Sequence, residues 1–169
     1  MSHPHEDTIN QAEQFLLIGD SAADRFPALS YDAYVKAGKS FYCFDYGGLS
    51  ESRGPTKGGI VYTSIDDLPE ERGDLAIIWV HPHRAKEAVE LAQSAGYTKV
   101  WFSFKTGHPD AVERAKELGM EVIEIGRCPV YYLNEKPRAC AGHAMMLKVS
   151  GSYAKPPQLD PNAKRRELW

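Results

Sequence analysis

A repeating unit runs through this chain: a short hydrophobic strand, a small or polar turn, and then a helical segment. The unit first appears at residues 15–18, which lead into Gly19, and it recurs as far as Cys128. Alternating strands and helices of this kind form an open parallel sheet with helices on both faces. Such sheets bind ligands in the crevice at the carboxyl ends of their strands, so the pattern predicts where a site lies and not its chemistry.

The most hydrophobic segment, residues 75–80, has no alternation of apolar and polar side chains. This is typical of a central parallel strand that is covered on both faces. The other expected strands are residues 15–18, 40–44, 60–62, 100–104 and 120–125. Helices are expected at residues 28–37, 82–95 and 109–118, and a capped helical turn at residues 64–68. The predicted fold is a Rossmann-like, doubly wound α/β/α domain with five or six mainly parallel strands.

The chain has 169 residues, which is enough for one such domain and short for two. We expect a flexible N-terminus at residues 1–13, the α/β domain at residues 14–149 and a C-terminal tail at residues 150–169. Residues 45–59 are rich in glycine and proline, which predicts a loop. After the last regular strand, residues 130–133 are expected to be extended and residues 139–148 helical.

The composition is that of a soluble globular protein, with 43% hydrophobic and 25% charged residues. A net charge of −3 gives no general attraction to nucleic acid or to anionic membranes. No apolar run approaches the ~20 residues of a membrane span. The three cysteines include no Cys-x-x-Cys pair, which favours a reduced cytoplasmic setting. The six histidines lack the spacing of metal ligands, so no metal site is predicted.

The turn after the first strand contains one glycine, Gly19. A dinucleotide-binding fingerprint has three, and Ser21 and Asp24 stand where the later two would lie. This argues against an ordinary NAD or FAD site. The turn still offers backbone N–H groups to an anion, and the hydroxyls of Ser21 and Ser30 are further candidate donors.

Four segments carry a family resemblance: residues 18–21 with Ser30-Tyr31, residues 59–69, residues 74–88, and Arg127-Cys128-Pro129. Their order and spacing resemble the small stand-alone CoA-binding proteins, whose fold is also the CoA-binding domain of succinyl-CoA ligase α subunits. The resemblance extends from about residue 15 to residue 133. It implies a Rossmann-like fold and CoA or acyl-CoA as the bound cofactor.

The resemblance also implies where each part of the ligand lies. The first loop and its helix end hold the phosphates, the residues after the second strand meet the adenosine, and the turn after the fourth strand lies against the pantetheine arm. Cys128 lines the pocket near the thiol end. The implied binding residues are Gly19, Ser21, Arg25, Ser30, Asp45, Val80, His81, Pro82, Arg84 and Cys128.

Two positions depart from the family pattern. Asp20 replaces a small or apolar residue, and a carboxylate there repels a pyrophosphate unless it turns away. Asp45-Tyr46 replaces the usual Asn-Pro after the second strand. Asp45 suits ribose hydroxyls and opposes the ribose phosphate of CoA. The candidate compensating cations are Arg25, Lys39, Arg53 and Lys57.

The predicted function is binding of CoA, acyl-CoA or a related nucleotide without catalysis by this chain, which has no phosphate-loop motif Gly-x-x-x-x-Gly-Lys-Ser/Thr. One alternative is an enzyme that uses Cys128, His81 or His108 on a thioester or phosphorylated substrate. The other is an interaction subunit with a decayed nucleotide pocket. Met145-Met146 and Leu168-Trp169 would then contact a partner protein, and the C-terminal tail is also a candidate contact with a second copy.

Overall fold

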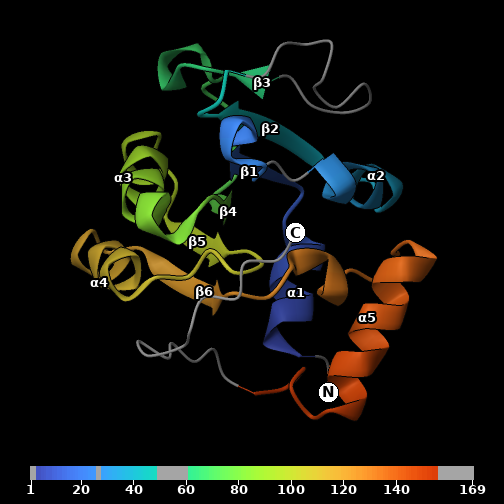
Figure 1. The fold of residues 1–169 in the computed structure, drawn as a ribbon. Coiled ribbons are helices and arrows are strands. Elements are labelled where there is room, and N and C mark those ends of the chain that lie inside the picture. The colour runs from blue at the N-terminus through green and yellow to red at the C-terminus, as the bar shows by residue number, and fades with distance from the viewer. Residues whose placement is uncertain (1–2, 26–27, 49–60, 156–169) are drawn as a thin grey trace.

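The computed structural model describes residues 3–25, 28–48 and 61–155. In this part of the chain one six-stranded sheet has the order β3-β2-β1-β4-β5-β6, and every neighbouring pair is parallel (Figure 1). The strands are β1 (Gln14–Gly19), β2 (Ser40–Asp45), β3 (Val61–Tyr62), β4 (Leu75–Trp79), β5 (Lys99–Phe102) and β6 (Glu121–Ile125). The strand order reverses between β1 and β4, as in Rossmann folds. The predicted fold class is therefore confirmed.

Helices cover both faces of the sheet (Figure 1). α3 (Ala85–Ser94) and α4 (Pro109–Glu117) pack on one face, while α1 (Pro4–Gln11), α2 (Ala28–Lys36) and α5 (Arg138–Val149) lie on the other. Successive strand side chains point to opposite faces. Leu16 and Ile18 of β1 accordingly join the core under α3 and α4, and Phe15 and Leu17 join the core on the α1, α2 and α5 side.

The central segment behaves as its composition predicts. Residues 75–78 of β4 are buried, with Ala76 and Ile78 in one core and Leu75 and Ile77 in the other. The helix that follows begins with a 3₁₀ turn, η3 (Pro82–Arg84), and continues as α3. The alanines on the inner side of α3 are buried, and small side chains let a helix approach a sheet closely.

The N-terminus differs from the expected flexible segment, because residues Pro4–Gln11 form a helix. The side chain of His3 caps α1 by accepting a hydrogen bond from the His5 backbone N–H. Ile9 is buried, and the buried His5 ring lies 2.7 Å from a carboxylate oxygen of Glu124 in β6. Pro4 and the acidic Glu6 and Asp7 are local signals of a helix start, and the buried contacts of His5 and Ile9 hold this short helix on the sheet.

The region after β6 also differs from expectation. Residues expected to be extended form a 3₁₀ turn, η4 (Pro129–Tyr132), whose opening proline already has the dihedral angle that a helix start requires. The expected helix is present as α5, and Tyr153 in the start of the predicted tail is buried. Residues 49–60 and 156–169 lie outside the described residues, including the predicted cations Arg53 and Lys57, the start of the strand at residue 60, and Leu168-Trp169.

None of the helices in the described ranges is long and apolar enough to cross a membrane.

Candidate ligand site at the carboxyl edge of the sheet

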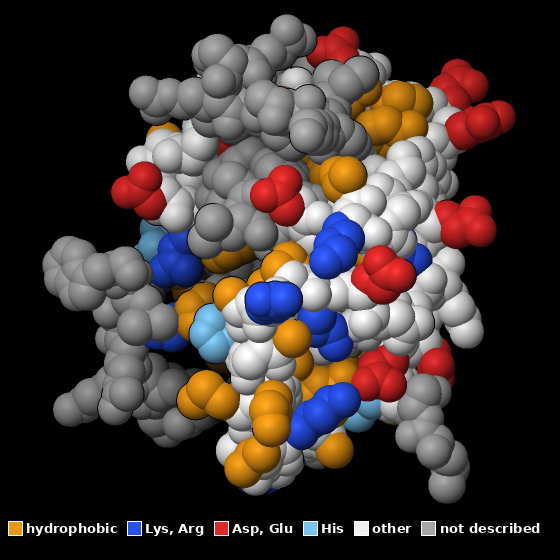
Figure 2. Space-filling model, turned by 90° about the vertical axis from the view of Figure 1, so that its right-hand side faces the viewer, with side chains coloured by type: hydrophobic (Ala, Val, Ile, Leu, Met, Phe, Trp, Pro, Cys, Tyr) orange, Lys and Arg blue, Asp and Glu red, His pale blue; other side chains and the backbone are white. Residues whose placement is uncertain are grey.

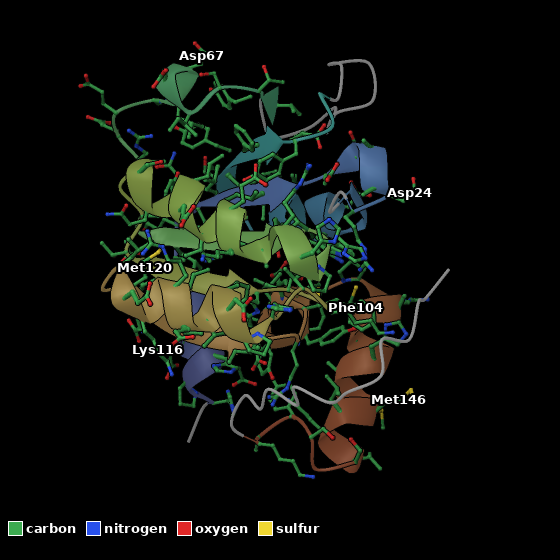
Figure 3. All side chains as sticks on the ribbon, turned by 60° about the vertical axis from the view of Figure 1, so that its left-hand side comes forward. Asp24, Asp67, Phe104, Lys116, Met120 and Met146 are labelled. Atoms are coloured by element: carbon green, nitrogen blue, oxygen red, sulfur yellow. The ribbon has the colours of Figure 1, made fainter. Side chains whose placement is uncertain are left out.

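The turns after β1, β2, β4 and β5 come together at one edge of the sheet. Gly19 is the register partner of both Asp45 and Trp79, so the ends of three strands are immediate neighbours. Asp24 follows β1 and Phe104 follows β5, and both lie on the same side of the molecule in Figure 3. Lys116 and Met120, near the start of β6, lie on the opposite side. The predicted convergence of these strand ends is therefore confirmed.

Ser21 uses its donors within the protein. Its backbone N–H donates to one carboxylate oxygen of Asp45 and its hydroxyl donates to the other, both at 2.7 Å. Gly47 packs against the same turn, since a Cβ atom at this position would lie 2.3 Å from Ser21 Oγ and 2.4 Å from the Ala22 nitrogen. The turn after β2 thus closes directly over the turn after β1.

Asp20 obtains its counter-charge from a residue not among the predicted cations. Arg84 Nη1 donates to Asp20 Oδ2 at 2.8 Å, with side-chain exposures of 34% and 7%. The guanidinium also lies over the Tyr46 ring, 4.9 Å from its centroid. Of the predicted cations, Arg25 exchanges two backbone hydrogen bonds with Asp20, and Lys39 donates to the Asn10 carbonyl. The Arg84 guanidinium is therefore paired with the Asp20 carboxylate.

Three buried polar atoms at the carboxyl edge lack a hydrogen-bond partner among the described residues: Asp20 Oδ1, the Tyr46 hydroxyl and Trp79 Nε1. Two others, on Arg72 and Tyr97, lie at the opposite edge. An unpartnered buried polar atom is unfavourable, so it needs an explanation such as a ligand. Burial raises the pKa of Tyr46 well above its ordinary value, which keeps the hydroxyl available as a donor.

The sequence does not single out Trp79 or Tyr46. Trp79 ends a continuous hydrophobic run and resembles an ordinary core residue, and Tyr46 opens a loop. Their positions at the strand ends could have indicated that they belong to the site. Each lies at or just beyond the last residue of a strand that neighbours β1.

Cys128 is buried together with two hydroxyl groups. Ser30 at the start of α2 and Ser103 after β5 both interact with its thiol. Burial raises the pKa of Cys128 to about 11, so the thiol is protonated at neutral pH. The preceding Arg127 does not lower that pKa, because its guanidinium donates to the Tyr132 hydroxyl and to main-chain carbonyls on another side.

The two candidate acid–base histidines occupy helix starts. His108 Nδ1 accepts a hydrogen bond from the Asp110 backbone N–H at 3.3 Å, so this ring caps α4. His81 precedes η3 without capping it, and its ring centroid lies 4.3 Å from that of His83. Val80 is buried in the α3 side of the core, so only its main chain is offered to a ligand.

A hollow of about 540 Å³ extends from Tyr46 along α3. It is within the volume range of small-molecule sites. The lining residues are Phe44, Tyr46, Thr63, Ser64, Ile65, Glu87, Glu90, Leu91 and Ser94. In the described part of the chain, no group of three or more His, Cys, Asp or Glu side chains is arranged to hold a metal ion.

A second hollow of about 500 Å³ lies between α2 and α5, away from the carboxyl edge. Lys36, Lys136, Met145 and Lys148 are among its lining residues. The face seen in Figure 2 carries exposed hydrophobic side chains next to lysine and arginine side chains. Met145 and Met146, the proposed partner contacts on α5, are 67% and 69% exposed.

Comparison with known proteins identifies the family. The family model described as a CoA binding domain matches residues 42–134, which is more than half of the chain. The chain belongs to the CoA-binding domain family. Within this CoA-binding domain the matched residues include Asp45, Trp79, Arg84 and Cys128.

Solved structures agree with the fold of the CoA-binding domain. A hypothetical protein from Pyrococcus horikoshii OT3 is 22% identical, with a TM-score of 0.61, over 76% of this chain and 86% of its own. A conserved hypothetical protein from Pyrococcus furiosus is 20% identical, with a TM-score of 0.54, over 70% of this chain and 97% of its own. At these identities the likeness shows the fold alone. No curated protein has a sequence that matches this chain.

Proposed function

We propose that this CoA-binding domain binds CoA or an acyl-CoA at the carboxyl edge of its sheet and does not itself catalyse a reaction. The observation that carries the proposal is the family match over residues 42–134, which begins in β2 and includes the ends of β2, β4 and β5 as well as Cys128. Three of the four turns of the edge are therefore within the matched segment.

The unpartnered atoms of the edge suit the uncharged parts of such a ligand. CoA carries amides, hydroxyls and an adenine ring, which supply both donors and acceptors. Trp79 Nε1 and the Tyr46 hydroxyl are the donors offered to them, and Asp20 Oδ1 is the acceptor. In the proposed pose the adenosine lies by Tyr46, the pantetheine arm passes the main chain of residues 80–82, and the thiol end reaches Cys128.

The phosphates fit this edge less well. Ser21 and Arg84, which are proposed binding residues, already have carboxylate partners. Of the other proposed contacts, Ser30 interacts with the Cys128 thiol. Gly19 and Arg25 remain, Gly19 by the absence of a side chain and Arg25 by its charge. The residues present therefore fit the adenosine and pantetheine parts of the ligand better than its phosphates.

Binding without catalysis is favoured by the state of the candidate catalytic groups. The Cys128 thiol is buried and protonated at neutral pH, whereas nucleophilic cysteines have lowered pKa values and partial exposure. The His108 ring already caps a helix. A buried thiol and a capping imidazole need no turnover to explain their positions.

The proposal is tested by thermal and chemical denaturation with CoA, acetyl-CoA, AMP, NAD and ATP. A ligand that binds only the folded state stabilises it by about 2.7 kcal/mol at a concentration of 100 Kd. We expect CoA-type ligands to stabilise the protein more than AMP does, because the pantetheine arm adds contacts. Native mass spectrometry of gently purified protein provides a second measurement, with a retained nucleotide-sized mass as the expected result. Equal shifts with AMP and CoA, or no shift with any of these ligands, would contradict the proposal.

A further inference from the structure

Two groups at the carboxyl edge that are suited to phosphate are each held by a carboxylate of the same chain. Ser21 donates its N–H and its hydroxyl to Asp45, and Arg84 donates to Asp20. Asp45 is 1% exposed. A phosphate that took over the Ser21 donors would remove two hydrogen bonds from the buried carboxylate of Asp45, which is unfavourable.

Asp45 also has no simple way to turn aside. Both of its oxygens are held at 2.7 Å, and its register partner Gly19 fixes the main chain at the end of β2. Gly47 closes over Ser21 at a distance that leaves no room for a side chain at that position. The negative charge of Asp45 is therefore fixed beneath the turns that follow β1 and β2.

We propose that Asp45 makes this site select an adenosine ligand whose ribose carries no phosphate. The inference rests on the proposed CoA site, in which the residues after β2 lie against the adenosine. A ribose phosphate there would lie close to a buried carboxylate, and buried charges are poorly screened. A free ribose hydroxyl brings no charge and so meets no such repulsion. The ligand class is a nucleotide thiol or thioester of the 3′-dephospho-CoA type.

The test compares CoA with 3′-dephospho-CoA by isothermal titration calorimetry on the full chain. We expect the wild-type protein to bind 3′-dephospho-CoA at least about tenfold more tightly than CoA, which is a modest requirement for one added dianion near a buried charge. Asp45→Asn keeps an oxygen for the Ser21 N–H and removes the charge. In this variant the preference should fall below about threefold, mainly because CoA binds better. Asp66→Asn, on the exposed turn η2 (Ile65–Asp67), removes the same charge elsewhere and should leave the preference unchanged.

The outcomes separate this inference from the proposed function. If neither ligand binds the wild-type protein, the proposed function is wrong and the inference falls with it. If CoA binds at least as tightly as 3′-dephospho-CoA, the CoA site stands and the role of Asp45 is refuted. The wild-type ratio decides this even if Asp45→Asn does not fold. An equal loss of preference in Asp45→Asn and Asp66→Asn would attribute the selection to net charge and would also overturn the role of Asp45.

Discussion

Two regions of this protein bury carboxylates on the sheet, and they differ in how completely their polar atoms are paired. Under α1, Glu124 accepts from its neighbour's N–H, from His5 at 2.7 Å and lies 3.5 Å from Arg127. At the carboxyl edge, Asp20 has one paired oxygen and one with no partner among the described residues, and the donors of Trp79 and Tyr46 nearby have none there either. A completed polar network fixes one structure, whereas an incomplete one is higher in free energy until another molecule completes it.

The region under α1 is built by an irregularity in the sheet. The register between β5 and β6 pairs Val100 with Val122 and then Trp101 with Glu124, so residue 123 is the extra residue of a β-bulge. A bulge re-aims the side chains that follow it. Glu124 consequently lies on the α1 side, where it meets His5, and this contact attaches the N-terminal helix to the last strand.

The first prediction concerns this completed network and has the largest expected effect. Glu124→Ala leaves the buried His5 ring and the Arg127 guanidinium without their carboxylate partner. Removing one member of a buried pair typically costs about 3 kcal/mol or more, and we expect that loss in the free energy of unfolding from urea titrations. Ligand affinity of the folded protein should be retained, because the ligand site lies at other residues.

Glu121→Ala is the matched control, since Glu121 is exposed on the same strand. Its effect should stay within about 0.5 kcal/mol. If Glu124→Ala weakened ligand binding as much as it lowered stability, the two regions would be one coupled network and the comparison would be wrong.

The same contrast explains what the sequence could and could not reveal. Strands and helices were predictable because their signals are local, as in the continuous run at residues 75–80 and the proline that opens residues 82–95. The packing of α1 on the sheet was not predictable, because its anchor joins His5 to a residue 119 positions away. Nor were the pairs Ser21–Asp45 and Asp20–Arg84, which depend on the register of β1 with its neighbours and on where α3 begins. The spacing of strands and helices predicted where the ligand edge of the sheet lies. Contacts between residues far apart in the sequence determine which charged groups at that edge are paired.

The second prediction concerns the thiol at the ligand edge. Burial raises the pKa of Cys128 from an ordinary 9.0 to about 11. The unfolded chain therefore loses this proton first, so the stability that the buried thiol contributes is fully present below about pH 9 and is lost as the pH rises toward 11. Two pKa units correspond to about 2.7 kcal/mol, so we expect this thiol to account for about 2 kcal/mol of the fall in the unfolding free energy of the wild-type protein over this range.

Cys128→Ala should flatten that dependence, with denaturant titrations at pH 8, 9.5 and 11 as the measurement. Tyrosines whose pKa values burial also raises, among them Tyr97 and Tyr131 at about 12, add a larger pH dependence that both proteins share, so the difference between the two proteins isolates the thiol. Identical slopes in the two proteins would mean that the thiol titrates normally. A Cys128 thiol of ordinary pKa would favour the alternative in which Cys128 is a reactive cysteine at this edge.

The last prediction has the smallest effect and tests the incomplete network directly. Tyr46→Phe removes a buried hydroxyl that has no partner within residues 3–25, 28–48 and 61–155, and it keeps the ring under the Arg84 guanidinium. The free protein should be unchanged or up to about 1 kcal/mol more stable, because no hydrogen bond is lost and a desolvated group is removed. Affinity for 3′-dephospho-CoA should fall about three- to tenfold, the worth of one hydrogen bond.

Tyr97→Phe is the matched control, since its hydroxyl is also buried and unpartnered among the described residues but lies at the opposite edge. It should shift stability in the same direction and leave affinity unchanged. If calorimetry instead gave equal affinities for both variants and the wild-type protein, the unpartnered hydroxyl at the ligand edge would have no more to do with binding than the one at the far edge.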